Sequence, residues 1–319
     1  MNAGAAPPTV LVLTGPTGSG KSELAIQLAA ALQPQLPVEI ISVDSVLVYR
    51  GMDIGSAKPS LEARARVPHH LIDIRDPAQS YSAGEFVRDA RAAIAAIQQR
   101  GRLPLLVGGT MLYLRALYNG LAALPPASQA LRRELDAQAA RAGWPSLHAE
   151  LARVDAAAAA RIARNDAQRI QRALEVHRLT GVPISLWQGR TQGAREQFRW
   201  LRYALVPTAR IDWSRHLAAR FDAMLRAGLV DEVRALHARG DLSEQHSSVR
   251  AVGYRQLWRY CADKCSLDEA AQQAIIATRQ LAKRQLTWLR HEQTITTLPA
   301  AAVGLAAIVA RSIHLAVGA

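Results

Sequence analysis

The chain has 319 residues, half of them hydrophobic, which is enough for a sizeable core in one large domain or two smaller ones. No apolar run is long enough to span a membrane, and the first residues lack the basic and apolar regions of a secretory signal, so we expect a cytoplasmic protein. The 39 Lys and Arg residues outnumber the 26 Asp and Glu residues, and the formal charge of +13 favours a polyanionic partner.

The first third of the chain alternates strand-like and helix-like segments. Short apolar runs bounded by glycine predict buried strands, and apolar residues at helical spacing predict amphipathic helices. The expected strands are 9–15, 38–44, 69–74 and 103–109, and the expected helices are 22–33 and 83–101. Because strands that alternate with helices form parallel sheets with helices on both faces, the predicted fold class is α/β.

The pattern changes at about residue 123. Between 123 and 197 the sequence shows helical segments and no convincing strand, whereas strand-like sequence resumes at 198–206. Helices dominate from 214 to 290, and 294–298 could add a last edge strand. We therefore divide the chain into a first part of the α/β core at 1–122, an all-helical insertion domain at 123–197, and a second, mostly helical part of the core at 198–319.

The stretch GPTGSGKS matches the phosphate-binding pattern G-x-x-x-x-G-K-[ST] in full and lies between a strand and a helix. Glycines let successive amides point at a phosphate, and the helix N-terminus adds positive potential. Lys21 supplies a charge, and the Ser22 hydroxyl suits Mg²⁺. The alternative is a glycine-rich turn without a ligand. The sequence thus predicts a P-loop NTPase-like core whose loop consists of Gly15, Pro16, Thr17, Gly18, Ser19, Gly20, Lys21 and Ser22.

Two further polar residues follow expected strands. Asp44 ends the second strand and is the only good candidate for a carboxylate beside the loop. A single carboxylate is fewer than an enzyme that hydrolyses ATP would be expected to need. Thr110 follows the strand 103–109, at the sheet edge where open α/β sheets bind ligands. Its hydroxyl could contact a phosphate or a nucleophile, or it could instead cap the following helix.

Basic residues gather in segments outside the loop. Arg169 and Arg172 crowd the first turns of a helix that Asp166 and Gly181 are expected to cap, and cations there oppose the helix dipole without an evident intramolecular partner. In 278–290, the basic side chains share one helical face. A solvated charged face is the ordinary explanation, but the total charge favours contact with a nucleic-acid backbone.

The segment VRAVGYRQ combines arginines and a tyrosine around Gly253. Arg250, Tyr254 and Arg255 are residue types that bind phosphates and stack on bases, although a packed turn would have a similar composition. This segment is a second candidate for nucleic-acid contact.

Seven segments together resemble, in the same order, the bacterial tRNA dimethylallyltransferases, also called tRNA isopentenyltransferases. They are GPTGSGKS, VDSVLVYRGMDIGSAKP, PHHLIDI, LLVGGTMLYLRAL, NDAQRIQRALEV, VGYRQLW and RQLAKRQLTWLR, and they extend from about residue 10 to 290. The second and fourth are highly specific. Many members of the family have Gln where this chain has Leu47, so an amide contact is not carried over to that position.

The resemblance implies that the loop holds the diphosphate of dimethylallyl diphosphate together with Mg²⁺. The prenyl group would pass to the exocyclic amine of the adenosine at tRNA position 37, just 3′ of the anticodon, with release of diphosphate. Asp44 would be the general base, and Thr110 and Arg220 would lie near the diphosphate. No water needs activating in this reaction, so one carboxylate suffices. We expect a monomer without a membrane partner.

The resemblance also implies contacts with the tRNA anticodon stem and loop, from the segment after Asp44, the helical insertion and the two basic segments of the second core part. The expected tRNA-contacting residues are Asp44, Ser45, Val46, Leu47, Thr110, Arg132, Gln168, Arg169, Ile170, Gln171, Arg172, Arg250, Ala251, Val252, Gly253, Tyr254, Arg255, Lys283, Arg284, Gln285, Leu286, Thr287, Trp288, Leu289 and Arg290.

Three other functions are compatible with parts of the pattern. A P-loop kinase could phosphorylate a nucleoside or small metabolite with ATP and use the helical insertion as a lid. A non-catalytic RNA-binding switch would bind tRNA in a nucleotide-dependent way and leave the base unchanged. An enzyme that prenylates free adenine nucleotides would have little use for a basic insertion of this size.

Overall fold

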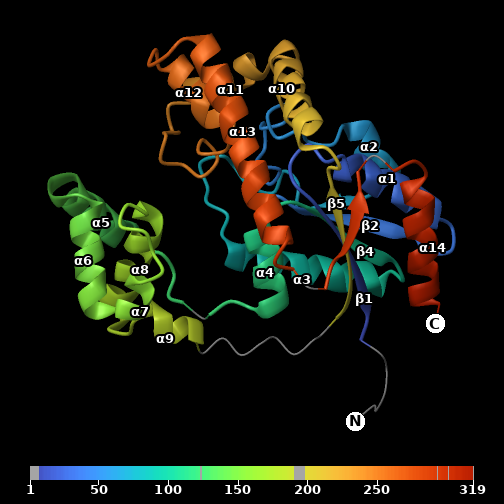
Figure 1. The fold of residues 1–319 in the computed structure, drawn as a ribbon, viewed down its shortest axis with the longest axis horizontal. Helices are drawn as coiled ribbons and strands as arrows, with labels where there is room; N and C mark the ends of the chain where they lie inside the picture. The colour runs from blue at the N-terminus through green and yellow to red at the C-terminus, as the bar shows by residue number, and fades with distance from the viewer. Residues whose placement is uncertain (1–6, 123, 190–197, 293, 301, 319) are drawn as a thin grey trace. The chain divides into compact units, whose positions relative to one another are not determined.

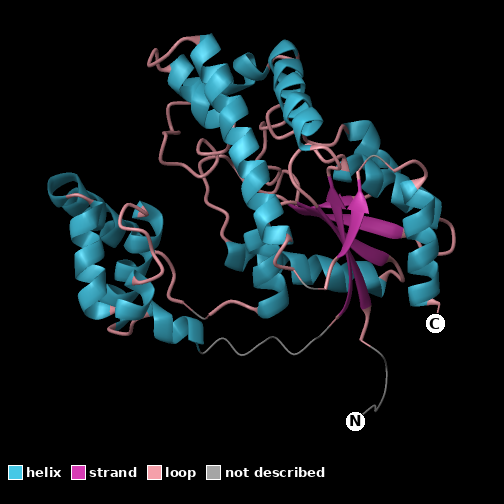
Figure 2. Ribbon diagram, viewed as in Figure 1, coloured by secondary structure: helices cyan, strands magenta, loops and turns pink. Residues whose placement is uncertain are grey.

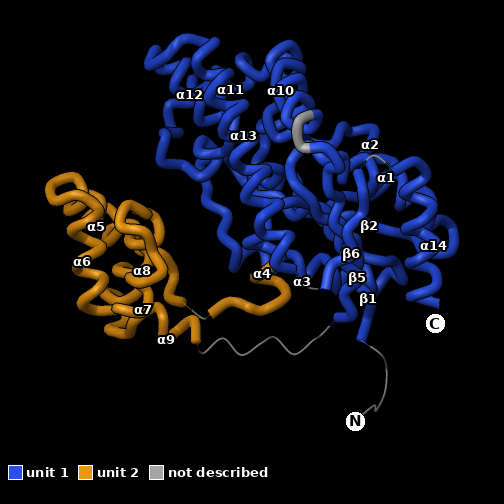
Figure 3. The backbone as a smooth tube through the Cα atoms, viewed as in Figure 1, with its two compact units in different colours: residues 1–114, 196–319 blue, residues 115–195 orange. Residues whose placement is uncertain are grey.

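The computed structural model describes residues 7–122, 124–189, 198–292, 294–300 and 302–318 (Figure 1). The chain divides into two compact units (Figure 3). The first comprises Met1–Leu114 with Glu196–Ala319, and the second comprises Arg115–Arg195. The helical insertion expected at 123–197 falls within the second unit apart from its last two residues.

Within the described residues, the first unit is built on a parallel sheet with the strand order β3-β2-β4-β1-β5-β6 (Figure 2). The strands are β1 Thr9–Thr14, β2 Val38–Val43, β3 His69–His70, β4 Leu103–Gly108, β5 Arg199–Val206 and β6 Thr296–Pro299. Every neighbouring pair is parallel. The sheet confirms the predicted α/β class, and β6 is the edge strand that the sequence suggested at 294–298.

The third strand is shorter than expected. A strand was predicted over 69–74, but β3 ends at His70. Leu71 and Asp73 have φ angles of 62° and 58°, in the left-handed region, where an extended strand cannot continue. The apolar run in this segment therefore leads into a tight loop instead of prolonging the sheet.

Helices cover both faces of the sheet. The helices that lie wholly in this unit are α1 Lys21–Leu32, α2 Leu61–Arg66, α3 Ala83–Gln99, α10 Arg210–Arg226, α11 Leu229–Ala238, α12 Tyr254–Cys261, α13 Leu267–Leu289 and α14 Leu305–Val317. α4 Met111–Asn119 begins in this unit and ends in the second. α1 and α14 share one buried core with alternate strand residues such as Leu11 and Leu105. α3 packs on β2 and β4 and lies outside that core, so it covers the opposite face.

Two long helices begin at capping boxes, in which a serine and a glutamate three residues later satisfy each other's backbone amides. Ser82 and Glu85 form the box of α3, and Ser266 and Glu269 form that of α13. These local signals fix where both helices start. No helix of the described residues is long and apolar enough to cross a membrane.

The second unit is a small helical bundle with its own buried core. Its helices are α5 Gln129–Ala142, α6 Trp144–Val154, α7 Ala156–Ala159, α8 Ala167–Thr180 and α9 Ile184–Gly189. The Asp166 side chain caps the start of α8 by accepting from the Arg169 amide, and Gly181 ends the helix with φ 70°. Both caps were predicted from the sequence.

A buried ion pair corrects one premise about α8. The fully buried Glu175 carboxylate accepts from Arg172 Nη1 at 2.6 Å and from Arg132 Nε at 2.9 Å. Burial alone would raise the pKa of Glu175, but the two guanidinium groups hold it below its ordinary value. Arg172 therefore does have an intramolecular partner, one turn further along the helix, contrary to the sequence interpretation.

Candidate active site

The phosphate loop connects β1 to α1 at the carboxyl edge of the sheet. Gly20 precedes the first helical residue with φ 85°, and among the described residues no side chain caps the first turn. The first amides of a helix lack intrahelical acceptors, so they are available to an anion. At Gly18, φ is 74° and a Cβ would lie only 2.5 Å from Leu217 Cδ2 of α10. The loop is thus shaped for glycine, as its pattern predicted.

Three charged side chains from different elements act on one another beside this loop. Lys21 Nζ donates to the Pro16 carbonyl at 3.2 Å, and burial lowers the pKa of Lys21 to about 8. The Asp44 carboxylate opposes this shift, whereas the Arg220 guanidinium adds to it. Burial likewise lowers the pKa of Arg220, against the effect of Asp44. The structure therefore brings together the predicted base and both predicted diphosphate-binding cations.

Thr17 connects the loop to two helices of the second core part. Arg220 Nη1 donates to Thr17 Oγ1 at 3.3 Å, and the Thr17 amide donates to Gln285 Oε1 at 2.8 Å. Gln285 Nε2 in turn donates to the Gly109 carbonyl at 2.8 Å. The buried Gln285 amide of α13 therefore bridges the phosphate loop and the loop after β4.

Asp44 and Thr110 lie on neighbouring loops, after β2 and β4. Asp44 Oδ1 accepts from the Val46 amide at 2.8 Å and from the Leu47 amide at 3.3 Å. Asp44 Oδ2 has no hydrogen-bond partner in the described part of the chain, so this oxygen is available to an incoming group. Two backbone amides thus hold one carboxylate oxygen and leave the other open.

The Thr110 hydroxyl joins the two loops. Its Oγ1 accepts from the Ser45 amide at 3.2 Å, while the Thr110 amide donates to the Val43 carbonyl at 3.2 Å. The Thr110 carbonyl accepts the first bonds of α4, but its side chain is turned to Ser45. The structure therefore favours the site role of Thr110 over a side-chain helix cap.

Four of the residues expected to contact tRNA have buried side chains, so that expectation is wrong for their side chains. They are Ile170, Tyr254, Gln285 and Leu289. Ile170 belongs to the core of the second unit, and the Tyr254 hydroxyl donates to Glu232 Oε1 at 2.6 Å. These side chains pack in the interior and are not exposed at the surface. By contrast, the side chains of Arg169, Arg250, Arg255, Lys283, Arg284 and Arg290 are exposed.

A surface hollow of about 530 Å³ lies along the exposed face of α13. Its lining residues are Gln280, Lys283, Arg284, Thr287, Trp288 and His291. Cationic side chains beside an indole ring are the combination that holds phosphates and stacks unpaired bases. The hollow coincides with the basic segment 283–290 that the sequence assigned to nucleic-acid contact.

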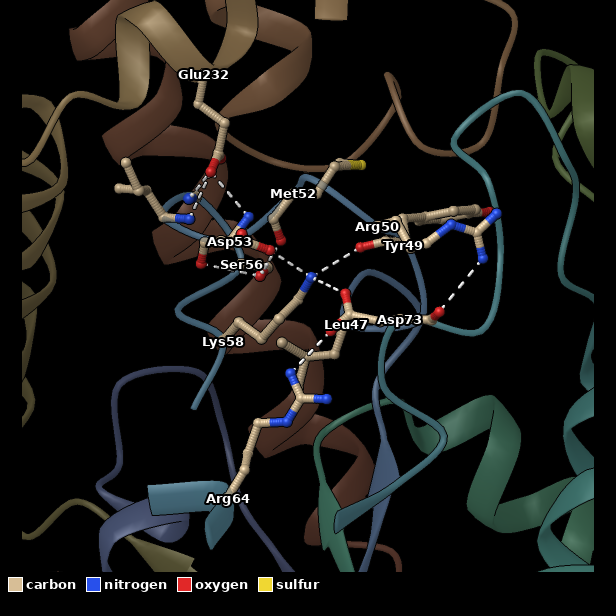
Figure 4. A network of polar contacts seen from close by, with 12 residues as sticks. Leu47, Tyr49, Arg50, Met52, Asp53, Ser56, Lys58, Arg64, Asp73 and Glu232 are labelled. Atoms are coloured by element: carbon tan, nitrogen blue, oxygen red, sulfur yellow. Dashed lines mark hydrogen bonds and ion pairs between the residues drawn. The ribbon is translucent and has the colours of Figure 1, made fainter. Parts of the chain in front are cut away.

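Sequence reasoning missed a polar network on the segment that follows Asp44 (Figure 4). It is centred on the buried Lys58 and on Glu232 of α11. The specific block VDSVLVYRGMDIGSAKP marked this segment as important, but its partners lie far away in the chain. Nothing near Glu232 in the sequence signals its contact with residues 53–55.

Metal ligands are few at this site. Across residues 7–122, 124–189, 198–292, 294–300 and 302–318, no group of three or more His, Cys, Asp or Glu side chains is placed to hold a metal ion. The exposed Ser22 hydroxyl at the start of α1 remains the predicted ligand. Mg²⁺ often keeps several waters and binds through substrate phosphates, so a sparse protein donor set suits it when a diphosphate is present.

Comparisons with known proteins identify the family of the chain. The sequence model of the family described as IPP transferase matches residues 47–292. A tRNA dimethylallyltransferase from Bordetella pertussis is 58% identical over 288 residues, which cover 90% of this chain and 91% of that protein.

Two solved structures extend the likeness to the whole fold. The full-length tRNA isopentenylpyrophosphate transferase from Bacillus halodurans is 35% identical with a TM-score of 0.68, covering 97% of this chain and 95% of that one. A eukaryotic dimethylallyltransferase acting on tRNA is 25% identical with a TM-score of 0.80, covering 98% of this chain and 80% of that one. On these grounds, and as its seven segments predicted, the chain belongs to the IPP transferase family of tRNA dimethylallyltransferases.

Proposed function

We propose that the protein transfers a dimethylallyl group from dimethylallyl diphosphate to the exocyclic amine of the adenosine at tRNA position 37, releasing diphosphate. The observation that carries this proposal is that the side chains of Lys21 and Arg220 both hydrogen-bond to the phosphate loop, at Pro16 and Thr17, where the Asp44 carboxylate acts on both charges. Two cations suit a departing diphosphate, and one carboxylate with an open oxygen suits a single proton transfer. The names of the relatives, which act on tRNA, support the same reaction.

Breaking the C–O bond of the donor leaves negative charge on the diphosphate. The loop amides, Lys21 and Arg220 would stabilise that charge as it develops, and stabilisation of this kind is usually the largest single contribution to catalysis. A bound diphosphate would raise the pKa of Lys21 again and keep the ammonium charged. The Thr110 hydroxyl accepts from Ser45, so its own proton is free to be donated to a diphosphate oxygen.

The adenine amine is a poor nucleophile because its lone pair is delocalised into the ring. As its nitrogen bonds to the prenyl carbon, the amine must lose a proton, and Asp44 Oδ2 is the acceptor. The electron pair of the broken C–O bond remains on the diphosphate. Because the adenine is stacked in the anticodon loop, it must swing out to reach Asp44.

Mg²⁺ is the cofactor that we propose, with the Ser22 hydroxyl as its protein ligand and the diphosphate and water as its remaining ligands. When bound, it neutralises charge on the leaving group. The protein groups that orient the diphosphate are the loop amides, Lys21 and Arg220.

In the first unit, the exposed Arg250 and Arg255 and the hollow on α13 are proposed tRNA contacts, and in the second unit the exposed Arg169 is another. We propose that the protein acts as a monomer in the cytoplasm. The kinase alternative is disfavoured by the relatives, which are prenyltransferases.

Mass spectrometry of tRNA nucleosides tests the proposal. Purified protein is incubated with unmodified tRNA, Mg²⁺ and dimethylallyl diphosphate, and a parallel sample receives γ-labelled ATP in place of the prenyl donor. The expected result is a C5H8 addition to one adenosine in the first sample and no label transfer in the second. Transfer from ATP alone would replace the prenyltransferase assignment with that of a kinase.

A further inference from the structure

Lys58 lies in the loop that follows Asp44, at the centre of a network of polar contacts (Figure 4). Its side chain is only 5% exposed. Its ammonium group donates to the Tyr49 carbonyl at 2.8 Å and to Asp53 Oδ1 and Asp73 Oδ1, each at 2.5 Å. All three ammonium hydrogens are therefore used. Arg64 Nη1 completes the cluster by donating to Asp73 Oδ2 at 2.8 Å.

Glu232 of α11 holds the same loop from the other side. Its carboxylate accepts from the amides of Asp53 and Ile54, both at 2.8 Å, and from the Gly55 amide at 3.2 Å. The buried Tyr254 hydroxyl donates to Glu232 Oε1 at 2.6 Å, which fixes the carboxylate in turn. Burial and the nearby Glu232 carboxylate raise the pKa of Tyr254, so this hydroxyl remains a donor. One carboxylate thus anchors three consecutive backbone amides of the loop.

The backbone around Lys58 is strained. Ala57, Leu71 and Asp73 have φ angles of 52°, 62° and 58°, and they account for three of the four non-glycine residues with positive φ in the described part of the chain. Such conformations persist only where surrounding contacts hold them. The ion pairs of Lys58 and Arg64 with Asp73 are contacts that can hold one of these residues in place.

A continuous series of hydrogen bonds connects Glu232 to Asp44. It passes from Glu232 to the Asp53 amide, and from the Asp53 carboxylate through Lys58 to Asp73. The Asp73 amide then donates to the Leu47 carbonyl at 3.1 Å. Finally, the Leu47 amide donates to Asp44 Oδ1 at 3.3 Å.

We propose that Glu232 and Lys58 are positioning residues that hold the Asp44 turn in place for proton transfer. Within the described part of the chain, neither side chain hydrogen-bonds to the phosphate loop: that of Lys58 contacts Tyr49, Asp53 and Asp73, and that of Glu232 contacts residues 53–55 and 254. Removing either one should therefore impair the step that needs Asp44 and spare binding of the prenyl diphosphate. The inference rests on the proposed function because its kinetic readout is prenyl transfer to tRNA.

The first variant is Glu232→Gln, which keeps the size of the side chain and turns one acceptor oxygen into a donor facing backbone amides. We expect kcat to fall about tenfold or more, as for a small misplacement of a catalytic group. KM for dimethylallyl diphosphate should stay within about threefold of the unmodified protein, because the loop contacts of Gln285 and Arg220 remain. Glu244→Gln is the matched control, because Glu244 is exposed and pairs with Lys264.

Tyr254→Phe is the second variant and guards against misfolding, because it removes a single hydroxyl and one bond to Glu232. It should lower kcat in the same direction by a smaller factor. Lys58→Met combined with Glu232→Gln then tests the shared path. If both residues act through the same series of bonds, kcat of the double variant should be little lower than kcat of the less active single variant. If the fold losses in kcat of the two single variants multiply in the double variant, or if kcat and KM change by equal factors, the proposal is refuted.

Amide hydrogen exchange gives a readout that does not depend on activity. In Glu232→Gln, exchange should rise at residues 53–55 and also at the Val46 and Leu47 amides that hold Asp44. Unchanged exchange at Val46 and Leu47 would overturn the positioning role even if the enzyme slows. If unmodified protein transfers no prenyl group to tRNA, the proposed function fails, and the exchange arm still decides whether Glu232 fixes the Asp44 turn.

Discussion

Arg220 of α10 and Thr17 of the phosphate loop are hydrogen-bonded at 3.3 Å although 203 positions separate them in the chain. α10 thus brings a guanidinium group to a loop formed near the N-terminus. Because burial already lowers the pKa of Arg220, its charge is poorly hydrated and would be stabilised by a diphosphate.

Replacing Arg220 by alanine should weaken binding of dimethylallyl diphosphate about tenfold or more, because a charge-assisted contact to the diphosphate is lost. Isothermal titration calorimetry with the diphosphate measures this, and tRNA affinity should change little. Arg226→Ala, at the exposed end of the same helix, is the control and should bind the diphosphate normally. Equal affinity in both variants would exclude Arg220 from the diphosphate site.

Asp44→Asn should lower the turnover number for tRNA prenylation by roughly 10²-fold, as expected for loss of a general base. Asparagine can still accept from the Val46 and Leu47 amides, so the turn should persist. Binding of tRNA in a filter assay should stay within a few-fold. Near-normal turnover would assign the proton transfer to another group.

Gln285→Leu should destabilise the protein, because it leaves the half-buried Thr17 amide and the buried Gly109 carbonyl without their partner. The free energy of unfolding should fall by about 1–3 kcal/mol for each unsatisfied group. Denaturant titration measures the loss, and the exposed Gln272→Leu on the same helix should show little change. A stability equal to that of the control would mean that the bridge is not needed to hold the two loops.

The depressed pKa of Glu39, near the start of β2, leads us to predict that the stability of the folded protein falls at acidic pH. Burial alone would raise the pKa of Glu39, but hydrogen bonds from Arg100 and His70 lower it to about 2. A depressed carboxyl pKa stabilises the folded state above the unfolded value near 4.5, and this contribution is lost as pH falls toward 2. Glu39→Gln should therefore lower stability at pH 7 by about 3 kcal/mol and flatten the loss between pH 4.5 and 2. Melting temperatures across this range check the slope, and parallel curves for both proteins would contradict it.

Arg169 and Arg172 offer a matched pair on α8. Arg172→Ala should destabilise the helical unit by about 2 kcal/mol, because Glu175 stays buried with fewer donors. Arg169 is 72% exposed, so Arg169→Ala should leave the melting temperature unchanged while weakening tRNA binding and flattening its salt dependence. Differential scanning calorimetry and binding at several salt concentrations separate the two effects. An unaltered salt slope for Arg169→Ala would place its charge away from the nucleic acid.

Local signals predicted the phosphate loop, both caps of α8 and most strands, because each depends on residues close together in the chain. The sequence also located Asp44 and Thr110 correctly, since the carboxyl ends of parallel strands meet at one edge. It could not reveal partners that the fold brings together from afar. Gln285 was assigned to the tRNA surface through the family resemblance of its segment, whereas its amide bridges two loops in the interior.

The charge of Arg172 was misinterpreted for a different reason. The dipole argument considered the helix alone, and the buried Glu175 outweighs it through direct ion pairing. The early end of β3 was likewise invisible, because the left-handed φ angles fall on Leu71 and Asp73 and not on glycine, and Asp73 is held by ion pairs with Lys58 and Arg64. Tertiary contacts decided both points.

The strand order also has a consequence for biosynthesis. β1 lies between β4 and β5, and β5 leaves the ribosome only after the whole helical unit has been made. In a nascent chain that ends before residue 199, β1 can therefore pair with β4 but not with β5. Such a chain also lacks α10 and α13, whose Arg220 and Gln285 contact the phosphate loop. Because the helical unit has a buried core of its own, we expect it to fold first on the emerging polypeptide. The phosphate loop gains its contacts with Arg220 and Gln285 only when translation is nearly complete.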